Sequence, residues 1–238
     1  MIKRIFKHEL KAMFRDSMYT FLFIYPIVIA VIAYFLIPYL ETHSDIFVKN
    51  LVLTLMLILN GIMYGAITGF TILDDQDDKV LLSLKITPIS VRWYIGIKLL
   101  LSYILGIFGT VLFMFASGFY QDVDFFTFLM IIILAPLQAP LFSLIINLFA
   151  QNKVEGFVIM KSSAMFLIAP VATIFLTKWT ELLFGFLPGY WTTKLIYSQL
   201  PSTIVFLKSN VLYFIFGLIT HIILISILFI LFSKKQKI

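Results

Sequence analysis

The chain has 238 residues, of which 61% are hydrophobic and 13% are charged, and its mean hydropathy is +1.05. A soluble domain averages about 25% charged residues, and a water-soluble fold of this size has too much surface to hide so much apolar area. The composition therefore indicates an integral membrane protein. The absence of cysteine excludes disulfides and thiolate metal sites. The net charge of +6 is typical of membrane topology and of contact with anionic lipid headgroups, and it does not indicate nucleic-acid binding.

Residues 1–16 predict an amphipathic helix that lies in the inner headgroup plane. Its apolar side chains fall on one helical face, namely Ile2, Ile5, Phe6, Leu10, Met13 and Phe14. Its five cations fall elsewhere, where they can contact anionic lipid. The alternative is a cytoplasmic tail that only obeys the positive-inside rule. We expect the segment to be retained, because no small-residue cleavage site follows a short apolar core.

Residues 17–238 predict one all-α domain with six transmembrane helices. A helix needs about 20 residues to cross a hydrocarbon core of about 30 Å. The charge-free stretches are Ser17–Leu40, Asn50–Leu73, Leu99–Gln121, Phe125–Asn152, Ser162–Thr177 and Ser209–Ser233. The fifth stretch is short, and it reaches full length only if the helix begins near Gly156 and includes Lys161.

Two details refine these spans. Leu182–Thr193 is apolar but too short to cross, and its Gly185, Pro188 and Gly189 favour re-entrant or interfacial segments between the fifth and sixth spans. In the fourth span, Pro136 and Pro140 predict a bend.

The distribution of basic residues predicts the orientation. With six spans, both termini lie on one side of the membrane. That side would hold fourteen of the 18 Lys and Arg residues, in segments 1–16, 74–98, 153–161 and 234–237. By the positive-inside rule it is the cytoplasmic side. We therefore expect a multi-pass protein of a bacterial cell membrane with both termini in the cytoplasm.

The loop between the second and third spans carries the strongest functional pattern. It begins with four carboxylates within 74–78, continues with the leucine-rich stretch Val80–Ile86, and reaches Pro88, which disfavours helical geometry at Thr87. Acidic side chains favour the N-terminus of a helix, so we expect the aspartates to cap a helix of about two turns with exposed leucines. Exposed leucines indicate a partner surface. The alternative is an ordinary acidic loop.

This loop resembles the first cytoplasmic loop of the permeases of type-2 ABC transporters. Their pattern is Glu-x-Glu, Gly-Thr-Leu, and Thr-Pro-[Ile/Val]-Ser before the third span. The matching residues here are Asp75-x-Asp77, Thr87-Pro88-Ile89-Ser90, Arg92-Trp93 and Gly96-Ile97-Lys98. The chain departs from the pattern at Lys79-Val80, where the family has Gly-Thr.

The resemblance implies a non-catalytic permease subunit of an ABC exporter. In that family the loop is a coupling helix, here about 75–90, that docks in a cleft of a separate ATPase subunit. The residues that it assigns to ATPase coupling are Asp75, Asp77, Asp78, Leu81, Leu82, Leu84, Thr87 and Pro88. It also implies a second permease chain, identical or different, and it places ATP and Mg in the partner subunit.

The sequence contains no ATP-binding or zinc-protease motif, which agrees with a non-catalytic subunit. No Gly-x4-Gly-Lys-[Ser/Thr] phosphate loop occurs, so we expect no ATP hydrolysis by this chain and no cofactor bound to it. No His-Glu-x-x-His zinc motif occurs either. The three histidines, His8, His43 and His221, are far apart in the sequence, and we expect His221 to be packed and hydrogen-bonded within its span.

The second and fifth spans line the central route in the resembled family. Gly61, Gly65 and Gly69 share one face of the second span and allow close helix approach. Either they pack within one protomer, or they form a dimer seam or path wall. The candidate residues for the path or seam are Asn60, Gly61, Tyr64, Gly65, Thr68, Ser162, Ser163, Met165 and Phe166.

Short loops and apolar spans favour a hydrophobic or amphipathic cargo. The chain resembles most the permeases of drug and peptide exporters, and among peptide exporters it resembles those of the amphipathic, cytolytic phenol-soluble modulins. Export of a lipid or polysaccharide is an alternative. A secondary transporter or channel without an ATPase is another, although no carboxylate lies within a predicted span to couple an ion.

Overall fold

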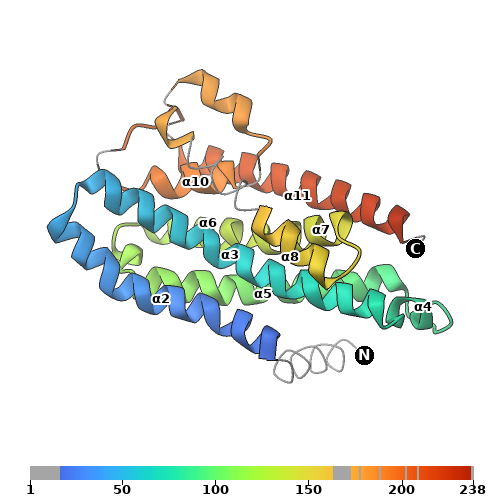
Figure 1. Ribbon diagram of the computed structural model, residues 1–238. Helices are drawn as coiled ribbons and strands as arrows, with labels where there is room; N and C mark the ends of the chain where they lie inside the picture. The colour runs from blue at the N-terminus through green and yellow to red at the C-terminus, as the bar shows by residue number, and fades with distance from the viewer. Residues whose placement is uncertain are drawn as a thin grey trace.

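The computed structural model describes residues 17–162, 173–176, 178–187, 189–201, 203–207 and 209–236. Every regular element within these ranges is a helix (Figure 1). The long continuous helices are α2 (Ser17–His43), α3 (Ile46–Asp77), α5 (Val91–Ala116) and α11 (Asn210–Lys235). Another crossing is divided into α6 (Phe125–Leu134), η2 (Ala135–Leu137) and α7 (Gln138–Phe149). The short elements are α4 (Val80–Leu84), η1 (Phe119–Gln121), α8 (Lys153–Ser162), η3 (Thr173–Phe175), η4 (Trp179–Phe184) and α10 (Tyr190–Tyr197).

Five helical segments are long and apolar enough to cross a membrane, at 17–43, 46–77, 91–116, 125–149 and 210–235. They confirm the first four predicted spans and the sixth, and the protein is a multi-pass membrane protein. The predicted fifth span falls on the end of α8 and on residues outside the described ranges. The total of six spans therefore stays a prediction, and so does the amphipathic helix of residues 1–16, which lie outside those ranges too.

The bundle has two distinct ends. We call the end that carries α4 the knob end, and the end that carries η4 and α10 the cap end (Figure 1). Near the start of α2, Tyr19 contacts Asp74 at the knob end, where Gln236 also contacts Gln76. Both ends of the described chain therefore lie at the same end of the bundle. The chain leaves α7 at the knob end, where Lys235 donates to the carbonyls of Leu148 and Ala150, and it enters α11 at the cap end, where Asn210 contacts Ser198 after α10.

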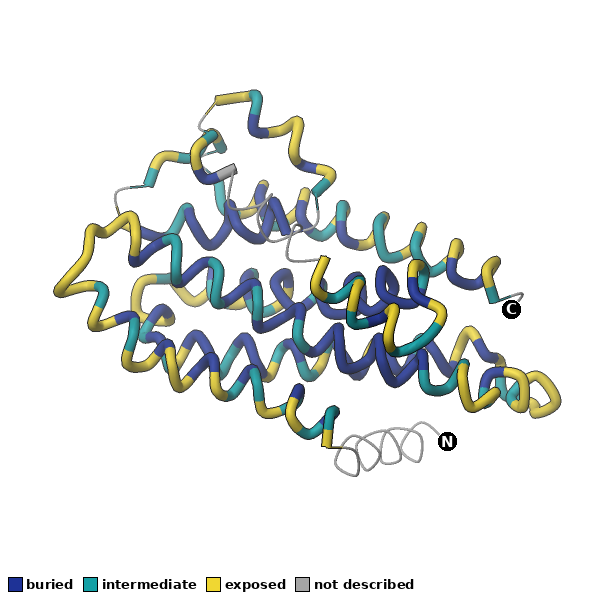
Figure 2. The backbone as a smooth tube through the Cα atoms, in the orientation of Figure 1, coloured by how far each residue is buried: buried dark blue, intermediate teal, exposed yellow. Residues whose placement is uncertain are grey.

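The centre of the bundle is α3, which packs against α2, α5 and α7. Its residues 60–73 are buried almost all round, whereas α2 and α11 have exposed outward faces (Figure 2). The close packing depends on glycine. A Cβ on Gly65 would collide with the carbonyl oxygen of Ala139 in α7, and a Cβ on Gly61 would lie 3.1 Å from the carbonyl oxygen of Ala135. These two glycines therefore pack against another span of the same chain.

The predicted bend in the fourth span is confirmed. The helix changes to 3-10 geometry at Ala135–Leu137, because Pro136 and Pro140 remove backbone donors at this level. On the other side of the bend, a Cβ on Gly106 of α5 would lie 3.0 Å from the Cβ of Pro136. The bend is thus held between glycines of α3 and α5.

Candidate functional site

The knob between α3 and α5 consists of residues 78–90 and projects beyond the ends of the spans (Figure 1). The chain reverses at Lys79, whose φ of 57° is the left-handed conformation that favours glycine. This is the position at which the sequence departs from the Gly-Thr of the resembled family. The short helix α4 follows, with five residues, and bends continue to Ser90, which precedes α5.

The acidic run lies elsewhere than predicted. It forms the last turn of α3 and does not cap the short helix, whose N-cap residue is Lys79. Carboxylates at a helix C-terminus are unfavourable unless cations offset them. Lys98 is the cation that offsets Asp75, with its Nζ 2.5 Å from Oδ2. Lys153 offsets Asp74, with its Nζ 2.8 Å from Oδ1. These pairs allow α3 to continue as a helix to Asp77.

These pairs belong to a larger network that joins the helix ends. The Tyr94 hydroxyl donates to Asp75 Oδ2 at 3.1 Å, and the Tyr19 hydroxyl donates to Asp74. Gln76 donates through Nε2 to Asn147 Oδ1 at 2.8 Å and accepts from Gln236 Nε2 at 2.6 Å. The turn 74–76 therefore contacts α2, α5, α7, α8 and the residue after α11, and we call it the hub. Asn147 bonds across helices a second time, because its Nδ2 donates to the Gly69 carbonyl at 3.0 Å.

The apolar residues of the knob divide into two sets. Leu81 is 4% exposed and packs among buried residues of α3, α5, α7 and α11, and Leu84 packs against the same cluster. The prediction that Leu81 is exposed was therefore wrong, because the one-and-a-half turns of α4 fold back onto the bundle. Leu82 is 57% exposed and Ile86 is 91% exposed. These two residues form the apolar tip of the knob.

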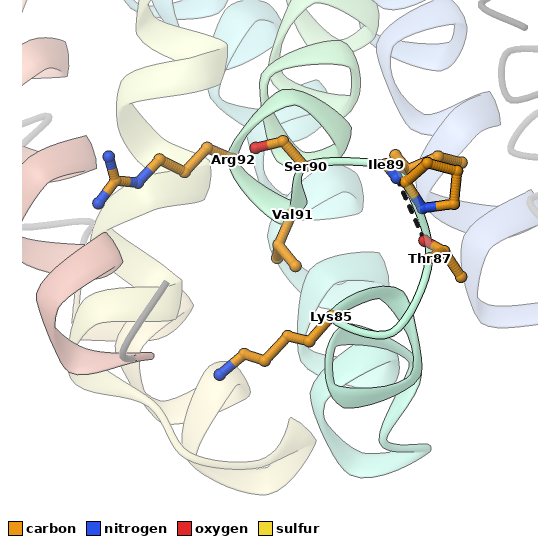
Figure 3. Close-up of a pocket in the computed structure, with 7 residues that line it drawn as sticks. Lys85, Thr87, Ile89, Ser90, Val91 and Arg92 are labelled. Carbon is orange, nitrogen blue, oxygen red and sulfur yellow. Dashed lines mark hydrogen bonds between the residues drawn. The ribbon is translucent and has the colours of Figure 1, made fainter.

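The polar residues predicted for coupling lie around this tip. Asp77, Asp78, Thr87 and Pro88 are all exposed. The Thr87 hydroxyl donates to the Leu84 carbonyl at 2.8 Å and accepts from the Ile89 amide at 3.3 Å, which fixes the turn after α4. Thr87 and Pro88 border an open groove of about 510 Å³ that continues to Lys85 and Arg92 (Figure 3). The knob thus presents apolar, acidic and basic groups on one projecting surface.

The residues predicted for a path or seam lie inside the bundle as far as the structure describes them. Asn60 and Tyr64 face Gly109 of α5, and Asn60 Nδ2 donates to the Gly109 carbonyl at 3.2 Å. Asn60, Gly61, Tyr64, Gly65 and Thr68 are all buried within the single chain. Ser162 is exposed at the end of α8. Ser163, Met165 and Phe166 lie outside the described residues.

The cap end contains a buried ion pair that the sequence analysis missed. Lys194 of α10 and Glu181 of η4 are both 0% exposed, and Lys194 Nζ lies 2.6 Å from Glu181 Oε2. Lys194 also donates to the Leu176 carbonyl at 2.7 Å, and the Tyr213 hydroxyl donates to Glu181 Oε1 at 3.1 Å. Burial lowers the pKa of Lys194, and its hydrogen bond to Glu181 and the charge of Glu181 oppose that shift. No sequence motif predicts this pair, because its two residues are thirteen positions apart and their further partners lie before η4 and in α11.

The histidine and carboxylate side chains of the described residues are further candidates for proton transfer or metal binding. His221 is 1% exposed, and its Nδ1 lies 2.8 Å from the Gly217 carbonyl oxygen, so the prediction of a packed, hydrogen-bonded histidine is confirmed. Within the described residues, no group of three or more His, Cys, Asp or Glu side chains is arranged to hold a metal ion. The described part of this end is a projecting knob with an exposed apolar tip, and the helix ends behind it are joined by the hub.

These features define the chain as a multi-pass helical membrane protein. A family model for "Fluoroquinolones export permease protein Rv2686c-like" matches residues 9–229, and the chain belongs to this family.

Two relatives support this membership. The chain is similar to the fluoroquinolones export permease proteins MT2760 and Rv2686c of two Mycobacterium tuberculosis strains, CDC 1551 / Oshkosh and ATCC 25618 / H37Rv. Each is 29% identical over 146 residues, which cover 60% of this chain and 58% of the relative. The chain thus spans less than two thirds of the length of these relatives. No solved structure matches.

Proposed function

We propose that this chain is the membrane subunit of an ATP-driven exporter, and that a separate ATPase subunit docks on the knob. The observation that carries the proposal is the apolar tip, where Leu82 and Ile86 are exposed on a knob that projects beyond the ends of α3 and α5. Exposed apolar groups at such a place indicate a protein partner. Membership of an export permease family and the likeness of the loop to an ABC coupling helix support the same assignment.

The hub explains how docking would move the spans. A push on the knob acts directly on the last turn of α3, since Lys79 follows that turn. A displacement of this turn would be transmitted to α5 through the Asp75–Lys98 ion pair and to α8 through the Asp74–Lys153 ion pair. Closure of two ATPase subunits on ATP would thus shift the spans of two permease chains. A route along Asn60, Tyr64 and Thr68 requires α3 to separate from its neighbours, because all three side chains are buried.

The proposed cargo is an apolar or amphipathic drug that is moved outward. The spans offer apolar walls, and the named relatives are fluoroquinolone export permeases. An amphipathic peptide, such as a phenol-soluble modulin, is the second candidate because it has the same apolar character. Drug and peptide are distinguished by measuring, in cells that express the chain with its ATPase, the intracellular accumulation of a fluoroquinolone and survival in the presence of an amphipathic cytolytic peptide.

The docking proposal is tested by co-purification of the full chain from the membranes of its own host. We expect an ATPase subunit to accompany it. Leu82→Asp with Ile86→Asp should abolish the association and the export, whereas the matched variant Leu82→Met with Ile86→Met should retain both. Both positions are exposed, so stability should change by no more than about 0.5 kcal/mol. Transport by the chain alone under an ion gradient would contradict the proposal and favour a secondary transporter.

A further inference from the structure

Three adjoining depressions at the knob end converge on Arg92. The first is bordered by Lys85, Ser90 and Arg92, the second by Arg92, Ser233 and Lys234, and the third by Arg92, Trp93 and Leu100. Phe229 of α11 lines both the second and the third. Together they form a groove between the first three turns of α5 and the last turns of α11, which we call the α5/α11 groove.

The groove has a cationic head and an apolar tail. Lys85, Arg92 and Lys234 line its head, and in Figure 3 the side chains of Lys85 and Arg92 extend to the same side, away from the turn at Thr87 and Ile89. The first turn of α5 adds backbone N–H groups without intrahelical acceptors, and the N-cap residue Ser90 makes no side-chain capping bond to them. Further along the spans, the lining is apolar, with Trp93, Ile97, Leu100, Phe229 and Ile230.

A buried hydroxyl in the groove points independently to a ligand. Ser233 lines the depression between Arg92 and Lys234 and is 4% exposed. Its Oγ has no hydrogen-bond partner among the described residues. A buried polar group without a partner is costly, and an acceptor oxygen supplied by a ligand would remove that cost.

We propose that the α5/α11 groove binds an anionic phospholipid of the leaflet at the knob end. Its phosphate would lie among Arg92, Lys234 and the first turn of α5, and one acyl chain would follow Ile97, Leu100 and Phe229 between the two spans. Basic pockets between transmembrane helices at the cytoplasmic side suit such headgroups, and a half-exposed Trp93 marks the level of the interface. Lys85 already joins the knob to the residue after α11, because its Nζ donates to the Gln236 carbonyl at 3.4 Å, and the lipid would lie beside this contact.

The test measures lipid binding to the purified full chain in detergent, so its result does not depend on an ATPase. Phosphatidylglycerol and phosphatidylcholine are added, and the retained lipid is counted by native mass spectrometry. We expect phosphatidylglycerol to be retained preferentially, and Arg92→Gln with Lys234→Gln to weaken its retention by roughly fivefold for each cation removed. The matched control is Lys79→Gln with Lys161→Gln, which removes two exposed cations outside the groove.

Equal weakening by the control pair would overturn the proposal, because it would show only general attraction of a basic surface. Equal retention of the two lipids by the unaltered chain would overturn it as well. If the double variant does not fold, Arg92→Lys serves instead, since it keeps the charge and loses the planar fork that binds phosphate. Weaker retention of phosphatidylglycerol by Arg92→Lys, by at least about twofold, supports a direct contact. Unchanged retention overturns it.

Discussion

The two ends of the bundle both contain lysine–carboxylate pairs, but in different surroundings. At the cap end, Lys194 and Glu181 are completely buried, whereas the Lys49–Glu41 pair between α2 and α3 is 8% and 62% exposed. At the knob end, the exposure of the pairs is graded. The Lys98 and Asp75 side chains are 2% and 15% exposed, and those of Lys153 and Asp74 are 35% and 27% exposed.

The difference indicates which end can rearrange. Charges buried away from water interact strongly and are costly to separate, whereas water screens and can replace a partly exposed pair. The cap end is therefore a fixed closure of η4, α10 and α11. The knob end can exchange one arrangement of its hub for another at moderate cost, as the proposed coupling to an ATPase subunit would require.

Glu181→Gln should have the largest effect. It keeps the shape of the side chain but leaves Lys194 buried without an anion, and it weakens the acceptor for Tyr213. Breaking one side of a buried pair costs about 3–5 kcal/mol in the free energy of unfolding. Thermal unfolding of the purified chain in detergent measures this loss.

The matched control at the cap end replaces both partners, as Glu181→Leu with Lys194→Met. Because it leaves no unpaired charge, it should be clearly more stable than Glu181→Gln. A double variant that is as unstable as the single one would show that shape, and not the unpaired charge, accounts for the loss.

Lys98→Met should have an intermediate effect. It removes the cation beside Asp75 and the bond to the Thr71 carbonyl, but Asp75 keeps some access to water and the Tyr94 hydroxyl. We expect a loss of about 1–3 kcal/mol. Lys153→Met provides the comparison, because its pair is more exposed and should contribute at most about 1 kcal/mol. Equal losses from the two variants would contradict the expectation that the more buried ion pair of the hub contributes more to stability.

The smallest effect should be a pH dependence at the start of α6. Hydrogen bonds from the Thr127 side chain, and then from the backbone amides of Thr127 and Phe126, lower the pKa of Asp124 below its ordinary value of 3.8. A lowered carboxyl pKa stabilises the fold above that ordinary value, and the contribution is lost as the pH falls through the lowered pKa.

Asp124→Asn tests this, because asparagine can cap a helix but does not titrate. Its stability relative to the unaltered chain should rise as the pH is lowered from about 5 to about 2, as followed by thermal unfolding. Parallel pH profiles for the two proteins would exclude a role for the titration of Asp124.

The sequence was sufficient for features that depend on local pattern. Long apolar stretches predicted five spans that the structure contains, and Pro136 predicted the bend at its own position. The projecting turn before Pro88 was also predicted, because a proline and a leucine-rich stretch outside the spans can be recognised one after the other.

What the sequence did not predict depends on tertiary contacts. The acidic run was assigned to the start of the short helix, but lysines from two other helices allow α3 to include it. A five-residue helix has too few residues to show which leucine is buried, so Leu81 and Leu82 could not be distinguished. The Glu181–Lys194 pair joins elements whose relative position no local pattern specifies.

The break in the fourth span determines how that span can move. Ala135–Leu137 is held between Gly61 of α3 and Gly106 of α5, which leaves no room for the span to slide along its axis as one rod. The arm toward the cap end, α6, packs against α10, α11 and α5, and the arm toward the knob end, α7, packs against α3, α11, α5 and α8. The 3-10 turn interrupts the regular hydrogen bonding of the helix, so we expect it to be the point at which α6 and α7 can change their relative angle.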